Sequence, residues 1–248
     1  MWFRVNFKEY VGINNHLRRV LINPFLAIID LQGAGILHTN ISEPNMLVER
    51  ADNAQGILVG FELAILEQRS YQNDESRPGS TASSQNDAAS TDGSRELSPS
   101  GAMYRAASNA VTPHVAFLAL DRCSDRPPAH RFRHDLESFI WSFFFVQSCF
   151  RNGQRIFSAQ VEKWYTGCWD MIRLEKSRFL EAEARSSKFA LSFAKSLYVE
   201  PGPLEACSQA LAAQLCEPEN LDPLRVLSTL RTARNAYAGL PSNTARLL

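Results

Sequence analysis

Apolar positions recur at helical spacing over much of the chain. In residues 14–34 the second half carries this spacing, and Pro24 suits the first turn of a new helix, where its missing N–H does no harm. Gly33 and Gly35 are expected to end that helix. The most apolar run, residues 139–150, is shorter than the about 20 residues of a membrane span. It therefore predicts a buried helix.

The helical pattern continues to the end of the chain. One apolar face is predicted from residues at helical spacing: Val161, Trp164, Tyr165, Cys168, Trp169 and Ile172. We expect its aromatic side chains in the core rather than in a binding site. Further helices are expected over residues 176–197, 204–215 and 221–238, and the alternating charges of the first should lie on its outer face. Together these segments predict a helical bundle.

Short β-type runs stand out against this helical background. Residues 46–48 and 57–59 flank a polar turn, which predicts a hairpin. Polar residues lie just before its first strand and just after its second, so we expect them to meet at one end of the hairpin. Alternation of polar and apolar residues within residues 1–10 favours one further strand.

Residues 67–112 differ in character from the rest, because they contain almost no large apolar side chains. Such a segment cannot bury enough surface to offset the entropy of ordering, and we predict that it is disordered. It is either a tolerated surface insertion or a regulatory loop. In the second case Ser98, which precedes a proline, is the candidate phosphosite.

Composition narrows the class of protein. The chain has 248 residues, 45% of them hydrophobic, which suits one domain with a sizeable core, and its formal net charge of zero gives no sign of nucleic-acid binding. Five scattered cysteines favour neither a disulfide framework nor a zinc site. With no secretory signal or membrane span visible, we expect an intracellular protein, cytoplasmic or nuclear. Nothing in the sequence indicates an obligate oligomer.

The polar residues around the predicted hairpin form an ordered motif. His38, Thr39 and Asn40 precede it, Asn45 follows at an interval of five, and Gly60-Phe61-Glu62 closes it. This order resembles the catalytic loop of protein kinases, H-R-D followed by Asn, and their metal-binding D-F-G. His38, Asn45 and Phe61 match that pattern. Thr39, Asn40 and Gly60 replace its Arg, its catalytic Asp and its magnesium-binding Asp.

Three details of this chain are similar to the fungal-type protein kinase family: Ile41-Ser42, Glu62-Leu63-Ala64 and the sequence HDLESF at residues 134–139. The resemblance implies a mainly α fold, the kinase large lobe with a short β-hairpin at the catalytic loop, in a degenerate and N-terminally truncated chain whose small lobe is largely absent. It divides the chain into four parts. These are a remnant of the small-lobe strand and hinge (1–10), the first part of the large lobe (11–66), the insertion in the activation segment (67–112) and the helical remainder (113–248).

The same resemblance implies a structural role for Asp135. In kinases the corresponding aspartate heads a buried helix and accepts hydrogen bonds from the backbone of the H-R-D turn, here at His38. An ordinary helix N-cap would use the same chemistry. A metal site built from Asp135 and the histidines near it is disfavoured by their spacing. We therefore group His38, Phe61 and Asp135 as structural residues at the site and expect no metal ligands.

Asp121 resembles the acidic residue of the kinase A-P-E motif, which pairs with an arginine late in the domain. Arg225 is the candidate partner. A helix cap or a surface acid is the alternative for Asp121.

The replaced residues carry the functional prediction. Asn40, at the position of the catalytic base, has an amide that cannot take a proton, and Gly60, at the magnesium position, has no side-chain oxygen. Asn45 and Glu62 are the candidates left for metal and nucleotide. We therefore predict an inactive pseudokinase that acts as a binding or scaffold module for an unknown protein partner and needs no cofactor.

Other interpretations stay open at this point. The chain would be a weakly active Ser/Thr protein kinase if Glu62 took over the metal, and it would then use ATP and Mg²⁺ with a small lobe from elsewhere. It would be an unrelated helical interaction domain if the motifs were coincidence. It would have no function if it were the product of a truncated gene.

Overall fold

The computed structural model describes residues 4–6, 17–49, 56–67, 113–151, 154–155, 158–184 and 203–238, all in one compact unit made of residues 1–67 and 112–248. The candidate phosphosite Ser98, the polar insertion and the second half of the helix expected over residues 176–197 lie outside the described residues. Within them, no helix combines the length and the apolar character that crossing a membrane requires.

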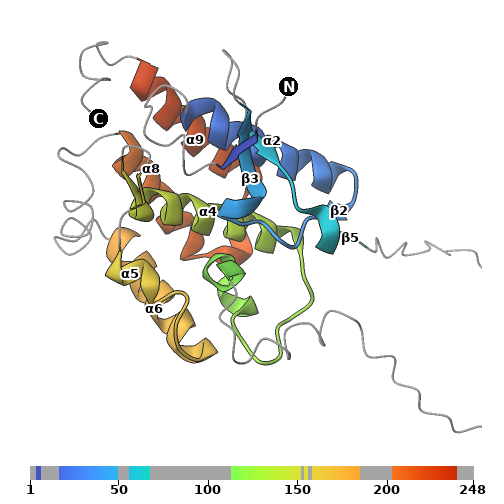
Figure 1. Ribbon diagram of the computed structural model, residues 1–248, viewed down its shortest axis with the longest axis vertical. Coiled ribbons are helices and arrows are strands. Elements are labelled where there is room, and N and C mark those ends of the chain that lie inside the picture. Colours follow the sequence, from blue (N-terminus) through green and yellow to red (C-terminus); the bar gives the residue numbers. More distant parts are fainter. Residues whose placement is uncertain are drawn as a thin grey trace, which may run out of the picture. The chain divides into compact units, whose positions relative to one another are not determined.

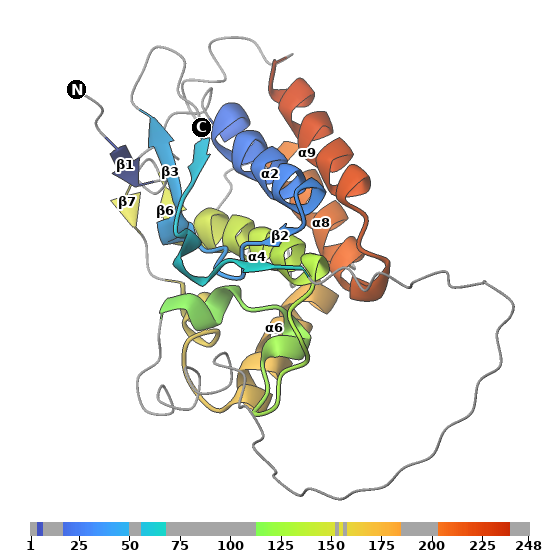
Figure 2. The same cartoon turned by 90° about the vertical axis from the view of Figure 1, so that its right-hand side faces the viewer.

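Helix α4, Phe132–Cys149, runs through the middle of the fold (Figures 1 and 2). It is the buried helix that the apolar run predicts, and its side chains from His134 to Val146 are all buried. The interior ring contacts explain this position. Trp141 lies 5.0 Å from Trp164 and Phe144 lies 5.1 Å from Phe179, so α4 packs through aromatic side chains against the segment after it.

Helix α2, Leu17–Gly33, lies on the side of α4 opposite to α6, Trp169–Ala184, in both views (Figures 1 and 2). The expectation that a new helix begins at Pro24 is wrong, because Pro24 lies inside this continuous helix. An interior proline costs about 3 kcal/mol. Burial of the flanking apolar face offsets that cost, and Phe25 within it lies 5.0 Å from Phe139 of α4. The predicted end of the helix at Gly33 is confirmed.

The predicted hairpin is confirmed. It consists of β3, Met46–Glu49, and β4, Gly56–Leu58, which pair antiparallel with Met46 opposite Leu58. The strand near the N-terminus, β1, Arg4–Asn6, pairs antiparallel with β3 and extends this sheet to the order β1-β3-β4.

A second ribbon closes the stretch around the hairpin. Strand β2, Ile36–Leu37, pairs antiparallel with β5, Ile65–Leu66. Because β2 precedes the motif that begins at His38 and β5 follows Glu62, this pairing brings the two ends of the motif together. A third ribbon, β6, Phe150–Arg151, and β7, Gln154–Arg155, follows α4.

The apolar face predicted around residues 161–172 is split between two helices. Helix α5, Ala159–Glu162, ends before a turn at Gly167, whose φ of 107° favours glycine, and α6, Trp169–Ala184, begins after it. The core position predicted for the aromatic side chains is confirmed for Trp164, which is fully buried, whereas Tyr165 and Trp169 are half-buried and Cys168 is exposed.

Helix α6 also corrects the prediction for residues 176–197. It begins seven residues before Lys176, and Lys176 itself is fully buried rather than on an outer face. The Lys176 ammonium is accommodated because it donates to the Leu118 carbonyl at 2.6 Å and lies 4.6 Å from the centre of the Trp141 ring.

The last two predicted helices are confirmed as α8, Pro203–Leu215, and α9, Pro223–Ala238. The two pack against each other, α8 also contacts α6, and α9 also contacts α2. All five cysteines are free thiols, in line with the sequence.

Candidate functional site

Asp135 holds the turn that follows β2. The backbone N–H of His38 donates to Asp135 Oδ2 at 2.8 Å, and that of Thr39 donates to Oδ1 at 3.0 Å. Asp135 is 2% exposed, so the donors and the acceptor remove each other's cost of burial. These are the contacts expected for Asp135 from the sequence. Since α4 begins at Phe132, Asp135 is not its N-cap.

A third donor to Asp135 was not predicted. His130 Nε2 lies 2.8 Å from Asp135 Oδ1, and the His130 ring stands edge-on to that of His134 with centroids 5.1 Å apart. His130 is close to Asp135 in the sequence, and that proximity alone suggests a metal site rather than a hydrogen bond. The position of His130, five residues before Asp135 and just outside the buried helix, is the sequence feature that could have indicated this hydrogen bond.

The His38 imidazole joins the two sides of the hairpin. Its Nδ1 is 3.3 Å from the backbone N of Asn40, which can only donate, and its Nε2 is 3.0 Å from the carbonyl oxygen of Val59, which can only accept. The ring therefore carries its proton on Nε2. Burial lowers the pKa of His38, in keeping with a neutral ring. The Phe61 ring packs against it at a centroid distance of 4.7 Å.

Thr39 adopts a backbone conformation that is unusual for its residue type. Its φ is 62°, in the left-handed region that β-branched residues avoid. Two hydrogen bonds oppose this strain. The backbone N–H is bound by Asp135, and the Oγ1 hydroxyl donates to the Leu63 carbonyl at 2.6 Å. Thr39 therefore ties the turn after β2 to the segment that follows Gly60.

Asn45 braces the loop between His38 and the hairpin. Its Nδ2 donates to the backbone carbonyl of Asn40 at 2.8 Å, and its own carbonyl accepts from the N–H of Val59 at 2.9 Å. The structure thus brings together Asn40 and Asn45, the two residues that the sequence assigned to the catalytic positions. The side-chain amide N–H of Asn45 is committed to holding the backbone.

Gly60 lies directly against Asn45. Its φ is 88°, and a Cβ placed on it would lie 2.5 Å from Asn45 Cγ and 2.6 Å from Asn45 Oδ1. Real Cβ atoms essentially never approach that closely, so any side chain at position 60 would displace Asn45. The amide of Asn45 therefore fills the space into which a side chain at position 60 would extend.

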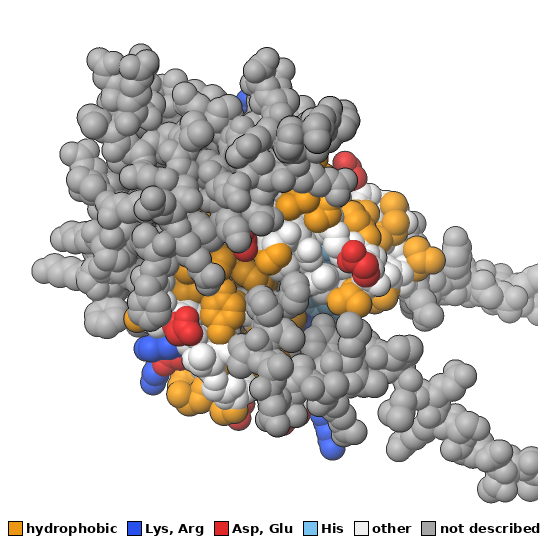
Figure 3. Space-filling model, in the orientation of Figure 1, with side chains coloured by type: hydrophobic (Ala, Val, Ile, Leu, Met, Phe, Trp, Pro, Cys, Tyr) orange, Lys and Arg blue, Asp and Glu red, His pale blue; other side chains and the backbone are white. Residues whose placement is uncertain are grey.

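Phe61 and Glu62 lie at the surface next to Gly60, in a short 3-10 helix, Phe61–Leu63. Phe61 is 46% exposed although one face of its ring covers His38. Ile65 and Leu66 of β5 are exposed too, and hydrophobic side chains gather over this part of the molecule in Figure 3. The Glu62 side chain is exposed.

Asp121 pairs with α4, and the expectation of Arg225 as its partner is wrong. Asp121 Oδ2 binds Arg133 Nη2 and lies 3.1 Å from His134 Nε2. Arg133 Nη2 also lies 3.0 Å from Glu219 Oε1, in the 3-10 helix Pro218–Asn220. Arg133 therefore connects three segments that are distant in the sequence. Nothing in the sequence around Arg133 indicates this role, because the pattern of its neighbours His134 and Asp135 does not involve it.

His134 supports the same arrangement in its neutral form. The backbone N–H of Arg131 donates to His134 Nδ1 at 3.0 Å, so the ring proton is on Nε2 and points to Asp121. Burial is the main cause that lowers the pKa of His134 to about 4.

Candidate metal ligands are sparse in the part of the chain that the structure describes. Nowhere in it do three or more His, Cys, Asp or Glu side chains gather so that they could hold a metal ion. Of the described carboxylates near the hairpin, Glu62 is exposed, Glu43 is buried, and the oxygens of Asp135 accept from the backbone of His38 and Thr39.

Comparison with known proteins adds one finding. No curated protein and no solved structure matches the chain. The family model described as "Fungal protein kinase" matches residues 19–147, which is just over half of the 248 residues. That range holds the motif from His38 to Glu62 and the helix that carries Asp135. The chain belongs to the fungal protein kinase family.

Proposed function

We propose that this protein is a pseudokinase, a kinase-like large lobe that binds a protein partner and does not transfer phosphate. The observation that carries the proposal is the contact between Gly60 and Asn45. The position where the family pattern has its magnesium-binding aspartate has no side chain, and the space for one is filled by the Asn45 amide.

The position of the general base supports the same function. Asn40 stands where the family has its catalytic aspartate, and an amide cannot take the proton of a substrate hydroxyl. Loss of a general base typically lowers the rate by about 10²- to 10⁴-fold. The backbone N–H of Asn40 binds His38 and its carbonyl binds Asn45, so the main chain here serves the loop itself.

The residues present do not fit magnesium and ATP phosphates. Mg²⁺ requires near-octahedral oxygen ligands, usually from one or two carboxylates together with phosphate oxygens. At the motif positions themselves Glu62 is the remaining carboxylate and its side chain is exposed, while Glu43, in the loop between Asn40 and Asn45, is buried. We therefore derive no catalytic step through a metal-bound nucleotide.

A binding role agrees with what the fold retains. The Asp135 contacts, the His38 ring and the hairpin form a hydrogen-bonded framework that stabilises the loop. The order of elements, a helix, a hairpin, a buried central helix and a helical remainder, supports assignment to the large lobe. Folds persist without their chemistry when function is carried by a surface.

Calorimetric titration of the purified chain with Mg-ATP tests this proposal. We expect no saturable magnesium-dependent heat, and no transfer of labelled γ-phosphate to a generic protein substrate or to the chain itself. Asn45→Ala and Glu62→Gln should leave both readings unchanged, because neither residue serves a nucleotide. Micromolar, magnesium-dependent ATP binding, with phosphate transfer that either variant abolishes, would contradict the proposal and favour an active kinase.

A further inference from the structure

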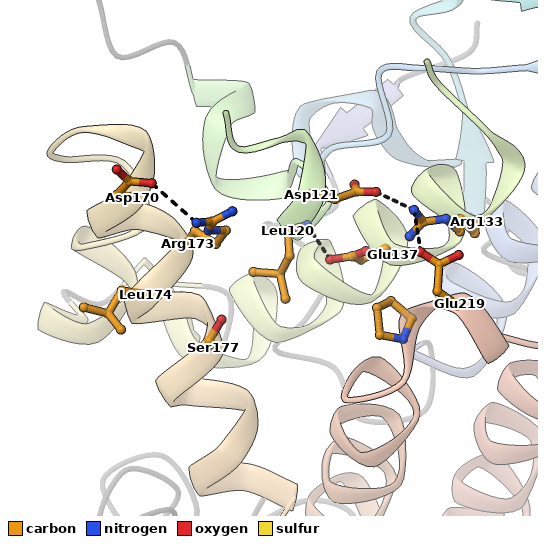
Figure 4. Close-up of a pocket in the computed structure, with 10 residues that line it drawn as sticks. Leu120, Asp121, Arg133, Glu137, Asp170, Arg173, Leu174, Ser177 and Glu219 are labelled. Carbon is orange, nitrogen blue, oxygen red and sulfur yellow. Dashed lines mark hydrogen bonds and ion pairs between the residues drawn. The ribbon is translucent and has the colours of Figure 1, made fainter. Parts of the chain in front are cut away.

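A cavity of about 740 Å³ lies away from the hairpin, between the 3-10 helix Leu120–Arg122, the first turns of α4, helix α6 and the 3-10 helix Pro218–Asn220 (Figure 4). Its volume falls in the range of ligand sites. None of the residues assigned to the candidate site at the hairpin lines it. Leu120 and Leu174 give it apolar walls, and the other lining residues are mostly charged.

Glu137 is the buried group of this cavity. It is 1% exposed, and its Oε1 accepts from the backbone N–H of Leu120 at 2.7 Å and from Trp141 Nε1 at 3.1 Å. Both bonds go to the same oxygen, so Oε2 accepts none from any described residue. Burial raises the pKa of Glu137, which reflects the cost of a carboxyl without a counter-charge in contact.

Charge around the cavity is unbalanced. Four acidic side chains line it, Asp121, Glu137, Asp170 and Glu219, against two arginines, Arg133 and Arg173.

Both arginines already have partners. Arg133 is shared by Asp121 and Glu219, and Arg173 lies 3.5 Å from Asp170 (Figure 4). The nearby buried Lys176 donates to Leu118. Among the described residues, Glu137 has no ion-pair contact, although the nearby Lys176 attracts its carboxylate. A cation bound at Oε2 would favour the ionised form of Glu137, which burial disfavours.

We propose that this cavity receives an arginine or lysine side chain from a segment of a partner protein, with the cationic head at Glu137 Oε2. The inference rests on the proposed function, since it gives the binding module a docking site. The methylene stem of the side chain would pack on Leu120 and Leu174, and its head would find a hydrogen-bond acceptor that the fold leaves open.

The surroundings of the cavity favour a protein segment as the source of this side chain. Leu174 is 42% exposed and the neighbouring Met171 is 49% exposed on α6, so residues that flank the basic side chain would cover them. Glu219 and Asp170 are exposed acids beside them that would attract a basic segment.

Calorimetry with three probes tests the proposal on the full chain: a blocked Gly-Leu-Arg-Leu-Gly peptide, the same peptide with citrulline in place of arginine, and N-acetylarginine amide. We expect saturable binding of the arginine peptide. The citrulline peptide should bind at least about tenfold more weakly, because its neutral ureido head makes no charge-assisted hydrogen bond to a carboxylate and has a carbonyl oxygen in place of one guanidinium nitrogen. N-acetylarginine amide should also bind more weakly, because it cannot cover the apolar residues of α6.

Glu137→Gln is the matched variant. The glutamine oxygen can keep the bonds from Leu120 and Trp141, while the oxygen left open is replaced by an N–H₂ group that faces the cation as a donor. It should fold normally and bind the arginine peptide at least about tenfold more weakly. Glu219→Gln, at an exposed position, should weaken binding about threefold. Glu162→Gln, an exposed acid on α5 with the same change in charge, should have no effect.

Three results would overturn the proposal: no saturable binding, equal affinity for the arginine and citrulline peptides, or unchanged affinity in Glu137→Gln. Equal affinity for the peptide and N-acetylarginine amide would overturn the protein source and favour a small cationic ligand. The Mg-ATP titration is independent of all of these. If the chain transfers phosphate and also binds the arginine peptide, only the pseudokinase proposal is refuted. If it does not transfer phosphate and does not bind the peptide, only the docking-site proposal is refuted.

Discussion

The turn at His38 and Thr39, which Asp135 holds, and the loop at Gly60 lie at opposite ends of one motif. They differ in how their polar groups are used. At Asp135 a carboxylate that is 2% exposed receives three donors from two segments, so it is buried and paired. At Gly60 the side chain is missing and a neighbouring amide fills its space. A buried, hydrogen-bonded carboxylate contributes to stability through its donors, whereas Gly60 has no polar side chain and shapes the loop through its backbone.

Replacement of Asp135 should change stability more than any other substitution that tests this comparison. Asp135→Ala leaves the N–H groups of His38 and Thr39 and the His130 ring without their acceptor. We expect a loss of about 3–5 kcal/mol in the free energy of unfolding. Urea denaturation followed by circular dichroism measures it. Asp170→Ala, at a side chain that is 86% exposed, is the control and should change stability by less than about 0.5 kcal/mol.

A loss below about 1 kcal/mol in Asp135→Ala would contradict the structural role of this residue. It would mean that water or a rearranged turn satisfies the His38 and Thr39 donors equally well.

A side chain at position 60 tests the other half of the comparison. Gly60→Ala should cost about 2–3 kcal/mol, because alanine is strained at a φ of 88° and its Cβ collides with Asn45. In the double variant with Asn45→Ala the collision disappears and the strain remains. A double-mutant cycle should therefore give a coupling of about 1 kcal/mol. Strictly additive effects would mean that Asn45 does not fill the space next to Gly60.

Glu183 sharpens the comparison, because it is a buried carboxyl without the donors that Asp135 has. Burial and the nearby Glu205 raise its pKa from 4.5 to about 7. Between those values the folded state holds a proton that the unfolded state releases, so stability should fall as pH rises from about 4.5 to about 7.

The size of this effect is about 2 kcal/mol, below the limit set by the full shift. Glu183→Gln should remove that part of the pH dependence and stabilise the protein at pH values above about 7. Denaturation midpoints of both proteins across that range measure it, with Glu181→Gln, at an exposed neighbouring position, as the control. Parallel pH profiles for wild type and Glu183→Gln would show that Glu183 titrates normally.

The sequence predicted those features that local pattern or a short motif encodes. The hairpin follows from two short apolar runs around a polar turn, and the buried helix from an uninterrupted apolar run. The prediction that a helix begins at Pro24 is wrong because the local preference of proline for a first helical turn is outweighed by burial of the face around Phe25, which is a tertiary effect.

The rest of the candidate site depends on distances that no pattern gives. Arg133 reaches Asp121 because α4 starts beside the 3-10 helix that carries Asp121. The fold, and not the spacing along the sequence, decides which arginine lies within reach of Asp121. The collision at Gly60 depends on a backbone angle and on the rotamer of Asn45. The burial of Lys176 depends on the Leu118 carbonyl and the Trp141 ring, two partners far from it in the sequence.

Thr39 provides the smallest test of the comparison, because it connects its two halves. Its N–H belongs to the Asp135 turn, while its hydroxyl donates to Leu63 beyond Gly60. Thr39→Val removes the hydroxyl and keeps the branched shape, so it should lower the free energy of unfolding by about 1 kcal/mol. Thr39→Ser keeps the hydroxyl and relieves the crowding of a branched side chain at a φ of 62°, so it should be neutral or slightly stabilising. Urea denaturation of the pair isolates the hydrogen bond, and equal stabilities would mean that the segment after Gly60 is held without Thr39.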